Sequence, residues 1–491
     1  MTASLDDRAE SAASRDTLTA VDGGVWDLLV IGGGTAGLVG ARTAASFGAS
    51  VLLVERDRAG GDCLWTGCVP SKALLAAASA AADARTAARL GVHVDGVRVD
   101  FAEVMARVHA AIAAIEPNDS PETLRETGVV VVKGHARFTG DDSAEVDGRA
   151  VRFRQALIAT GSNPLVPPIP GLREANPLTS DSVWDLTELP ERLVVLGGGS
   201  IGCELGQAFT RLGSTVTVVE AAERLLTNED AEAARIVTEA LVRDGADVLT
   251  GEPVTALEGS EVVLEGGRRV FADAVLVAVG RRPDTSGLDL EAAGVQTDDR
   301  GFVVVDKHLR TTNPQVWAAG DVSGHPQFTH VAGVHGSTAA TNAVLGLRRS
   351  AEVTAVPRVT YTSPEIASVG VRSDEPGVTT RALGHDEVDR AVVEDRTVGF
   401  TRLVLDGSGT IVGATVVGPR AGETLAELTL AVRKGFKPSD IASTMHPYPT
   451  WGDGPWNASI ADVRARLQAP VARRAVAALV VLRRRWLDLR Y

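Results

Sequence analysis

The amino-acid sequence predicts an α/β fold, with two βαβ domains built around glycine-rich turns and a C-terminal α+β domain after them. The glycine-rich turns at residues 32–37 and 197–202 each follow a short apolar strand and precede a helical stretch. After residue 358, apolar and polar residues alternate in segments such as 400–405 and 411–417, which is typical of an antiparallel sheet. A length of 491 residues allows about three domains.

The first βαβ unit begins near Trp26. We expect a strand over residues 27–31, a helix over 38–47 and a second strand over 50–54, which ends at Glu55. Further on, an Ala-rich helix is expected over residues 70–90 and another helix over 101–115, while the Pro-rich residues 163–170 indicate a linker into the second unit.

The three glycines of the first turn have separate physical roles. Gly32 permits a tight turn, Gly34 lets a pyrophosphate approach the backbone, and Gly37 lets helix and strand pack closely. The helix N-terminus offers its partial positive charge to the phosphates, and Glu55 lies at the expected distance to bind an adenosine ribose. Strand, turn, helix and acid in this order predict a Rossmann-like dinucleotide-binding domain.

The second βαβ unit repeats this plan and ends at Glu220, with glycines at the same three places: Gly197, Gly199 and Gly202. A carboxylate at position 220 would repel a 2′-phosphate, so the sequence favours NADH over NADPH. Arg224 lies nearby and keeps NADPH as the alternative.

Composition and charge narrow the class of protein. A net charge of −14 argues against a nucleic-acid partner. Three cysteines, Cys63, Cys68 and Cys203, make no secreted disulfide framework and indicate a reducing cytoplasm. Residues 1–24 lack an apolar run, so we expect a disordered tail and no signal peptide. No stretch approaches the ~20 apolar residues of a membrane span.

The cysteine pair is expected to do redox chemistry. On a regular helix, two Cα atoms five residues apart would be roughly 8 Å from each other, beyond the ~7 Å limit for a disulfide. The segment must therefore distort, and Gly67 gives it room. A thiol beside a helix N-terminus and a cation has a lowered pKa. A purely structural disulfide is the alternative, but so short a loop gains little stability from a crosslink. Cys203 has no partner in the sequence, and we expect it to be a packed apolar residue.

Residues 60–72, Gly-Gly-Asp-Cys-Leu-Trp-Thr-Gly-Cys-Val-Pro-Ser-Lys, closely resemble the active-site signature of the class I pyridine nucleotide-disulfide oxidoreductases. This family includes dihydrolipoamide dehydrogenase, glutathione reductase and mercuric reductase. The resemblance runs from about residue 26 to about residue 455 and includes further motifs at residues 159–161, 279–283, 319–321 and 361–365.

The resemblance implies a role for each matching residue. Cys68 would be the charge-transfer thiolate beside the flavin of FAD, and Cys63 the thiol that attacks substrate. Lys72 would lie near the flavin N5 and pair with Glu204. The remaining FAD contacts would come from Gly61, Gly134, Thr160, Gly161 and Asp321, and Gly280 would lie near the nicotinamide nucleotide.

Near the C-terminus the chain departs from the disulfide reductases. They carry His-Pro-Thr with a Glu three residues later, and this His, from the other subunit, is their proton carrier. Here Tyr448 occupies the place of the His and Asp453 the place of the Glu, while His446 lies two residues before Tyr448. A phenol with a pKa of about 10 is a poor base for a dithiol. A tyrosine at this place resembles the pattern of mercuric reductase, but the sequence has no cysteine after Cys203 to capture a metal.

The domain prediction follows from these units. We expect an FAD-binding domain over residues 25–170 and 285–350, an NAD(P)-binding domain over 171–284, and an interface domain over 351–460 that forms a homodimer. Residues 461–491 combine arginines with an apolar stretch, which indicates a basic amphipathic helix that either contacts an anionic membrane surface peripherally or packs on the protein itself.

The predicted activity is an FAD-dependent NAD(P)H oxidoreductase that reduces a small disulfide, or oxidises a dithiol, through Cys63 and Cys68. One alternative is a quinone or metal-ion reductase that acts directly from the flavin, with the cysteines as spectators. The other is a flavin-containing redox sensor, against which the intact nicotinamide-binding unit argues.

Overall fold

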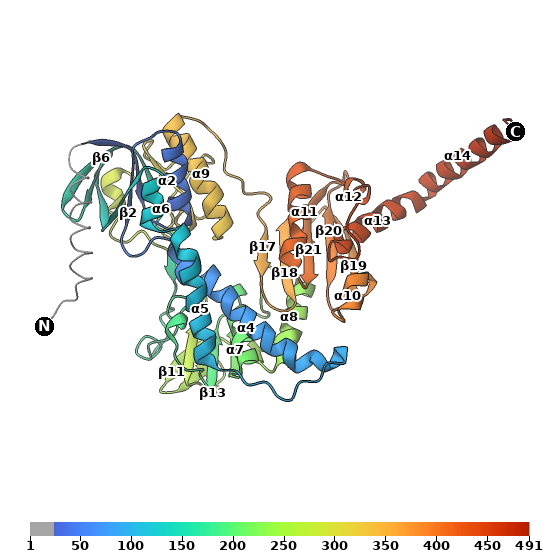
Figure 1. Ribbon diagram of the computed structural model, residues 1–491, viewed down its shortest axis with the longest axis horizontal. Coiled ribbons are helices and arrows are strands. Elements are labelled where there is room, and N and C mark those ends of the chain that lie inside the picture. The colour runs from blue at the N-terminus through green and yellow to red at the C-terminus, as the bar shows by residue number, and fades with distance from the viewer. Residues whose placement is uncertain (1–23, 491) are drawn as a thin grey trace. The chain divides into compact units, whose positions relative to one another are not determined.

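The computed structural model describes residues 24–490 (Figure 1). Except for Gly24, the tail predicted over residues 1–24 lies outside this described part. The described chain divides into two compact units. Unit 1 comprises residues 24–82, 97–219 and 252–353, and unit 2 comprises residues 83–96, 220–251 and 354–490. The domain boundaries drawn from the sequence stay predictions.

The first βαβ unit of the sequence lies in the parallel part of a mixed sheet in unit 1. β1 (Val25–Ile31) lies between β2 (Val51–Glu55) and β6 (Arg149–Ile158), with β3 (Val129–Lys133) beyond β2 and β16 (Val316–Ala318) beside β6. Alternate residues of β1 enter separate apolar cores on the two faces of the sheet, as expected of a central parallel strand.

The register of this sheet gathers the cofactor motifs at one edge. Ile31 lies opposite both Val54 and Ile158. The turn after Ile31 therefore meets Glu55 and Thr160 at the carboxyl ends of the strands, where open α/β sheets bind their ligands.

Two helices pack together over this sheet, α2 (Thr35–Ser46) and α9 (Thr329–Leu345) (Figure 1). They approach so closely that a Cβ at Gly336 would lie 2.2 Å from the carbonyl oxygen of Ala36. This glycine therefore sets how near α9, and the residues at its start, can come to the turn that begins α2.

The second βαβ unit has the predicted plan. β8 (Arg192–Leu196) pairs in parallel with β9 (Thr215–Glu220) and with β14 (Ala274–Val277), and α7 (Ser200–Leu212) follows the second glycine turn. α5 (Phe101–Ile115) matches its predicted bounds, and its Phe101 ring packs against Phe209 of α7 with ring centroids 6.2 Å apart.

At the start of the Pro-rich linker, β7 (Ser162–Pro164) pairs antiparallel with β15 (Arg281–Pro283). The Ala-rich helix is α4 (Cys68–Thr86), and a 3-10 turn, η1 (Ala87–Leu90), follows it. Further elements in this part of the chain are α3 (Gly61–Trp65), η2 (Glu116–Asn118), α6 (Pro121–Glu126), β4 (Ala136–Gly140), β5 (Ser143–Val146), η3 (Val183–Asp185), β10 (Asp247–Thr250), β11 (Val254–Glu258), β12 (Glu261–Leu264), β13 (Arg269–Phe271), η4 (Leu290–Ala293) and η5 (Asp321–Ser323).

Unit 2 contains the antiparallel sheet that the alternating segments predicted. Its strand order is β17-β18-β21-β20-β19, and α11 and α13 cover it. The elements are β17 (Arg358–Thr360), β18 (Glu365–Gly370), β19 (Thr379–Gly384), η6 (His385–Glu387), α10 (Asp389–Val393), β20 (Phe400–Leu405), β21 (Ile411–Gly418), α11 (Ala421–Lys434), α12 (Pro438–Ala442) and α13 (Asp453–Gln468).

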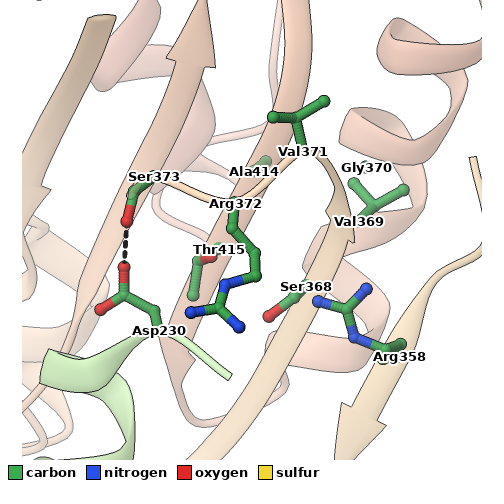
Figure 2. A pocket seen from close by; sticks show the side chains of 10 residues that line it. All are labelled: Asp230, Arg358, Ser368, Val369, Gly370, Val371, Arg372, Ser373, Ala414 and Thr415. Atoms are coloured by element: carbon green, nitrogen blue, oxygen red, sulfur yellow. Dashed lines mark hydrogen bonds between the residues drawn. The ribbon is translucent and has the colours of Figure 1, made fainter. Parts of the chain in front are cut away.

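A polar junction ties α8 (Ala231–Asp244) to this sheet (Figure 2). Asp230 caps α8 and accepts a hydrogen bond of 2.6 Å from Ser373. Arg358 and Arg372 line the small pocket beside it, but each is already paired with a carboxylate: Arg358 with Glu229 at 3.1 Å, and Arg372 with Asp374. We therefore assign the pocket a structural role.

The predicted basic helix is present as α14 (Pro470–Asp488) (Figure 1). None of its described residues is buried, and Leu479 and Leu482 are 65% and 61% exposed. Packing of this helix on its own chain, one of the two alternatives, is therefore not what the described structure shows. Within residues 24–490, no helix is both long and apolar enough to cross a membrane.

Candidate active site

The first glycine turn has the geometry of a phosphate cradle. Gly32 has a φ of +106°, and a Cβ at Gly37 would lie 1.9 Å from the carbonyl oxygen of Gly32. A Cβ at Gly34 would meet only the Cα of Gly61, at 3.8 Å. Among the described side chains none caps the N-terminus of α2, so its first N–H groups point at this open space.

Glu55 is held at the end of β2 by two backbone donors. Its Oε2 accepts from the N–H of Gly33 at 2.5 Å, and its Oε1 accepts from the N–H of Asp57 at 2.7 Å. The carboxylate is thus fixed next to the turn, where it can accept hydrogen bonds from a ribose.

The second turn repeats the glycine geometry of the first. Gly197 has a φ of +107°, a Cβ at Gly202 would lie 1.9 Å from the carbonyl oxygen of Gly197, and a Cβ at Gly199 would meet no atom within 4 Å. Glu220 accepts a hydrogen bond from the N–H of Ala222 at 2.8 Å, as Glu55 does from Asp57. The repeat seen in sequence is therefore also a repeat of geometry.

Two glycines join the first turn to its surroundings. Gly61 begins α3 with a φ of +56°, and a Cβ there would lie 2.7 Å from the Cα of Gly34. The N–H of Gly134 donates to the carbonyl oxygen of Glu55 at 2.8 Å. Both therefore keep backbone close to the cradle.

The thiol pair lies at a break between two helices. α3 ends at Trp65, residues 66 and 67 intervene, and α4 begins at Cys68. A Cβ at Gly67 would lie 2.8 Å from the carbonyl oxygen of Asp62, so glycine makes the distortion possible. Cys63 and Cys68 are free thiols within hydrogen-bond reach of each other.

The two thiols are electrostatically unequal. The hydrogen bond from Cys63 lowers the pKa of Cys68 to about 6, helped by Thr329, whose Oγ1 lies 3.2 Å from its Sγ, and by the charge of Lys72. The same hydrogen bond, together with burial, raises the pKa of Cys63. At neutral pH, Cys68 is the thiolate and Cys63 keeps its proton.

An ion pair lies one helical turn after Cys68. Nζ of Lys72 is 2.8 Å from Oε2 of Glu204, whose side chain is buried in α7. This is the pair that the resemblance implied, and it joins the thiol helix to the second nucleotide-binding unit.

A polar chain connects the thiol segment with Asp321. Oγ of Ser162 donates to Asp321 at 2.8 Å, Nε of Arg281 donates to Oγ of Ser162 at 2.8 Å, and Arg281 forms an ion pair with Asp62. Burial raises the pKa of Asp62 to about 6, although Arg281 opposes this, and burial also raises the pKa of Asp321. Ser162 and Arg281 were not among the predicted site residues.

Three predicted nucleotide contacts lie near these hydrogen-bonded polar side chains. Oγ1 of Thr160 donates to the carbonyl oxygen of Asp284 at 2.6 Å. Gly161 and Gly280 have φ values of +73° and +131°, and a Cβ at either would meet no atom within 4 Å. Open glycines beside the fixed carboxylates fit FAD and a nicotinamide nucleotide. Within residues 24–490, no group of three or more His, Cys, Asp or Glu side chains is placed to hold a metal ion.

In unit 2, the three predicted residues of the proton site are held differently. Tyr448 is 67% exposed, and its hydroxyl donates to Oδ2 of Asp389 at 2.6 Å. Asp453 does not take this hydrogen bond: it is buried, and its Oδ2 accepts from the N–H of Thr450 at 3.1 Å. His446 forms a hydrogen-bonded pair with Glu427 at 3.0 Å.

Comparison with known proteins gives two family matches. Residues 26–336 match the pyridine nucleotide-disulphide oxidoreductase model, and residues 356–459 match the dimerisation domain of that family.

Individual relatives point the same way. The chain is 38% identical to a mercuric reductase of Bacillus cereus over 87% of this chain and 70% of that protein, and 39% identical to one of Streptomyces lividans over 87% and 94%. It is 35% identical to a dihydrolipoyl dehydrogenase of Geobacillus stearothermophilus over 87% of this chain and 94% of that protein. Among solved structures, LpdA of Mycobacterium tuberculosis has a TM-score of 0.81 at 29% identity, covering 90% of this chain and 100% of that one.

A second similar solved structure is a metal complex of a flavoprotein. The Cu(II) complex of RclA, an HOCl-induced flavoprotein disulfide reductase of Escherichia coli, has a TM-score of 0.79 at 26% identity, covering 89% of this chain and 99% of that one.

Proposed function

The chain belongs to the pyridine nucleotide-disulphide oxidoreductase family and is an FAD-dependent enzyme, and we propose that it reduces a small disulfide with electrons from NADH. The observation that carries this proposal is the inequality of the two thiols, with Cys68 as thiolate and Cys63 as the protonated partner. A spectator pair would not need such opposite environments.

In the proposed reaction, Cys63 attacks one sulfur of the substrate disulfide, its proton passes to the leaving sulfur, and the first thiol product leaves. The Cys68 thiolate then attacks Cys63, the second product leaves, and a Cys63–Cys68 disulfide forms. The first glycine turn and Asp321 would hold FAD, which would supply the transfer of two electrons from the nicotinamide that returns this disulfide to two thiols. The reverse direction, dithiol oxidation by NAD, uses the same residues.

The proton site is proposed to come from a second subunit. The chain carries the dimerisation domain of its family at residues 356–459, which supports a homodimer. Tyr448 of the second subunit would then face Cys63, and its exposure in the single chain leaves it able to do so. His446 is less suited, because its Nε2 bonds Glu427, its Nδ1 bonds the carbonyl oxygen of Thr444, and its ring stacks on Trp456.

The test is an anaerobic titration of the FAD-loaded protein with NADH, followed by visible absorption. Two electrons should produce a long-wavelength band from the Cys68 thiolate beside oxidised flavin. Bleaching of the flavin without this band would remove the thiols from the electron path and favour direct reduction of a quinone.

NADH is expected to be the better reductant by about tenfold or more in kcat/KM, because Glu220 repels a 2′-phosphate. The guanidinium of Arg224, which could have reversed this preference, donates to the carbonyl oxygens of Leu226, Thr227 and Glu229. Steady-state kinetics with NADH and with NADPH measure the two kcat/KM values, and equal values would contradict this prediction.

A second candidate substrate is a thiophilic metal ion. Mercuric reductases are among the relatives at 34–39% identity, and Tyr448 stands where the disulfide reductases carry His. Capture would rest on Cys63, Cys68 and Tyr448, since the sequence has no cysteine after Cys203. NADH-dependent loss of Hg(II) in the presence of excess thiol measures this activity.

The exposed helix α14 is proposed to bind anionic lipid. Apolar side chains such as Leu479, Leu482 and Trp486 recur at spacings of three and four, and arginines occupy much of the remaining surface. The protein should sediment with anionic vesicles at moderate salt and not with neutral ones. A triple change of Arg483, Arg484 and Arg485 to Glu should abolish binding, and vesicle binding that ignores this change would contradict the proposal.

A further inference from the structure

The carboxylate that faces Tyr448 comes from a residue outside the sequence motifs described above. Asp389 is the first residue of α10, 59 residues before Tyr448. Its Oδ2 accepts the hydrogen bond of 2.6 Å from the Tyr448 hydroxyl. Asp453, the acid that the sequence offered for this position, is occupied with the backbone of Thr450.

The segments that carry Asp389 and Tyr448 are held together at a second point. His385, four residues before Asp389, is buried, and its ring centroid lies 5.7 Å from that of Trp451, three residues after Tyr448. Nε2 of His385 bonds Oγ1 of Thr401 at 3.1 Å in the underlying sheet. The hydrogen bond between Asp389 and Tyr448 therefore joins two anchored segments.

This hydrogen bond decides what Tyr448 can offer a substrate. A phenol has one proton to donate, and an ionised carboxylate can only accept. While the proton points at Asp389, the phenol oxygen presents its lone pairs to anything else that approaches. Such an oxygen suits a cation or the S–H group of a dithiol. It does not suit the thiolate that leaves when a disulfide is cleaved, because that thiolate needs a proton.

We infer that Asp389 is a specificity-determining residue, which turns Tyr448 into a hydrogen-bond acceptor and so favours thiophilic cations and dithiols over disulfides. The inference rests on the thiol relay of the proposed function, and among its substrates it favours the thiophilic metal ion and the dithiol of the reverse direction over the disulfide. Asp389 touches Tyr448 and not the reacting atoms, so it is a positioning residue. The hydrogen bond to Asp389 and, more weakly, the negative charges of Asp389 and Asp453 also raise the pKa of Tyr448.

The variant Asp389→Asn tests the inference, because it removes the charge with little change in shape. Its amide can donate to the phenol oxygen and release the Tyr448 proton toward substrate. We expect the ratio of kcat/KM for bis(2-hydroxyethyl) disulfide, an aliphatic disulfide whose leaving thiolate takes up a proton, to that for Hg(II) with excess thiol to rise about tenfold. The matched control is Asp386→Asn, which removes a charge from the neighbouring 3-10 turn and should leave the ratio unchanged.

Two further measurements separate a specific role from a structural one. In a Tyr448→Phe background, Asp389→Asn should no longer change the ratio, because its effect passes through the hydroxyl. The ultraviolet titration of Tyr448, isolated as the difference between the protein and its Tyr448→Phe variant, should move to lower pH in Asp389→Asn. An unchanged ratio, or a change that persists without the hydroxyl, would overturn the inference.

A different result would contradict the proposed function. If Cys63→Ser left turnover of both substrates intact, the thiol relay itself would be wrong. If Cys63→Ser abolished turnover while Asp389→Asn left both the ratio and the titration unchanged, only the inference about Asp389 would be lost.

Discussion

Replacing Cys63 with serine is expected to lower NADH-dependent disulfide reduction by about a thousandfold, the scale on which loss of a catalytic nucleophile acts. A hydroxyl is much less acidic and less nucleophilic than a thiol, so it can neither open the substrate disulfide nor pair with Cys68. Reduction of the flavin by NADH should survive, because the nicotinamide reacts before the thiols are involved. Stopped-flow absorption separates these two steps.

The matched control is Cys203→Ser. Cys203 is buried in α7, and its thiol donates to the carbonyl oxygen of Gly198 at 3.4 Å, so serine can keep the same hydrogen bond. Its disulfide turnover should stay within about twofold of the original, the usual outcome for a change that preserves contacts. Disulfide turnover that persisted in Cys63→Ser would assign the electrons to a direct route from the flavin.

The sequence predicted those parts of the site that depend on local order. Gly32, Gly34 and Gly37 lie within six residues, and their roles follow from a strand, a turn and a helix. The structure gives them the expected geometry, with one glycine in the turn, one open to ligand and one in close contact. The break between the helices of the thiol pair follows from the disulfide limit in the same way.

Contacts between distant segments could not be predicted from spacing. Thr329 reaches Cys68 across 261 residues, and Arg281 reaches Asp62 across 219. Neither contact leaves a periodic signal, because each depends on how the strands and helices pack. The pair of Lys72 with Glu204, 132 residues apart, was expected only through the family resemblance.

The acid that bonds Tyr448 is not the one that spacing along the sequence indicates. Asp453 stands at the spacing of the family's Glu, yet a shorter side chain at the start of α13 reaches the backbone of Thr450 instead. Asp389 takes its place from another element. Similarly, the pattern of residues 461–491 predicted an amphipathic helix but could not tell that α14 would leave its apolar face exposed.

The long-wavelength band of the two-electron-reduced enzyme is expected to disappear as the pH falls through about 6, because the band requires the Cys68 thiolate and the pKa of Cys68 is lowered to about 6. The hydrogen bond from Cys63 contributes most, followed by Thr329 and the charge of Lys72, while burial acts in the opposite direction. An ordinary thiol with a pKa of about 8.5 would lose the band more than two pH units higher. Anaerobic absorption spectra over a pH series measure the midpoint.

Variants at position 329 show whether the structure accounts for this midpoint. Thr329→Ala removes the hydroxyl that lies 3.2 Å from the Cys68 sulfur, so the thiolate loses a donor and the midpoint should move to higher pH. Thr329→Ser keeps the hydroxyl and should stay near the original value, which controls for the lost methyl group. A midpoint near 8.5 in the unaltered protein, or equal midpoints in both variants, would mean that the hydrogen bonds around Cys68 do not set its charge.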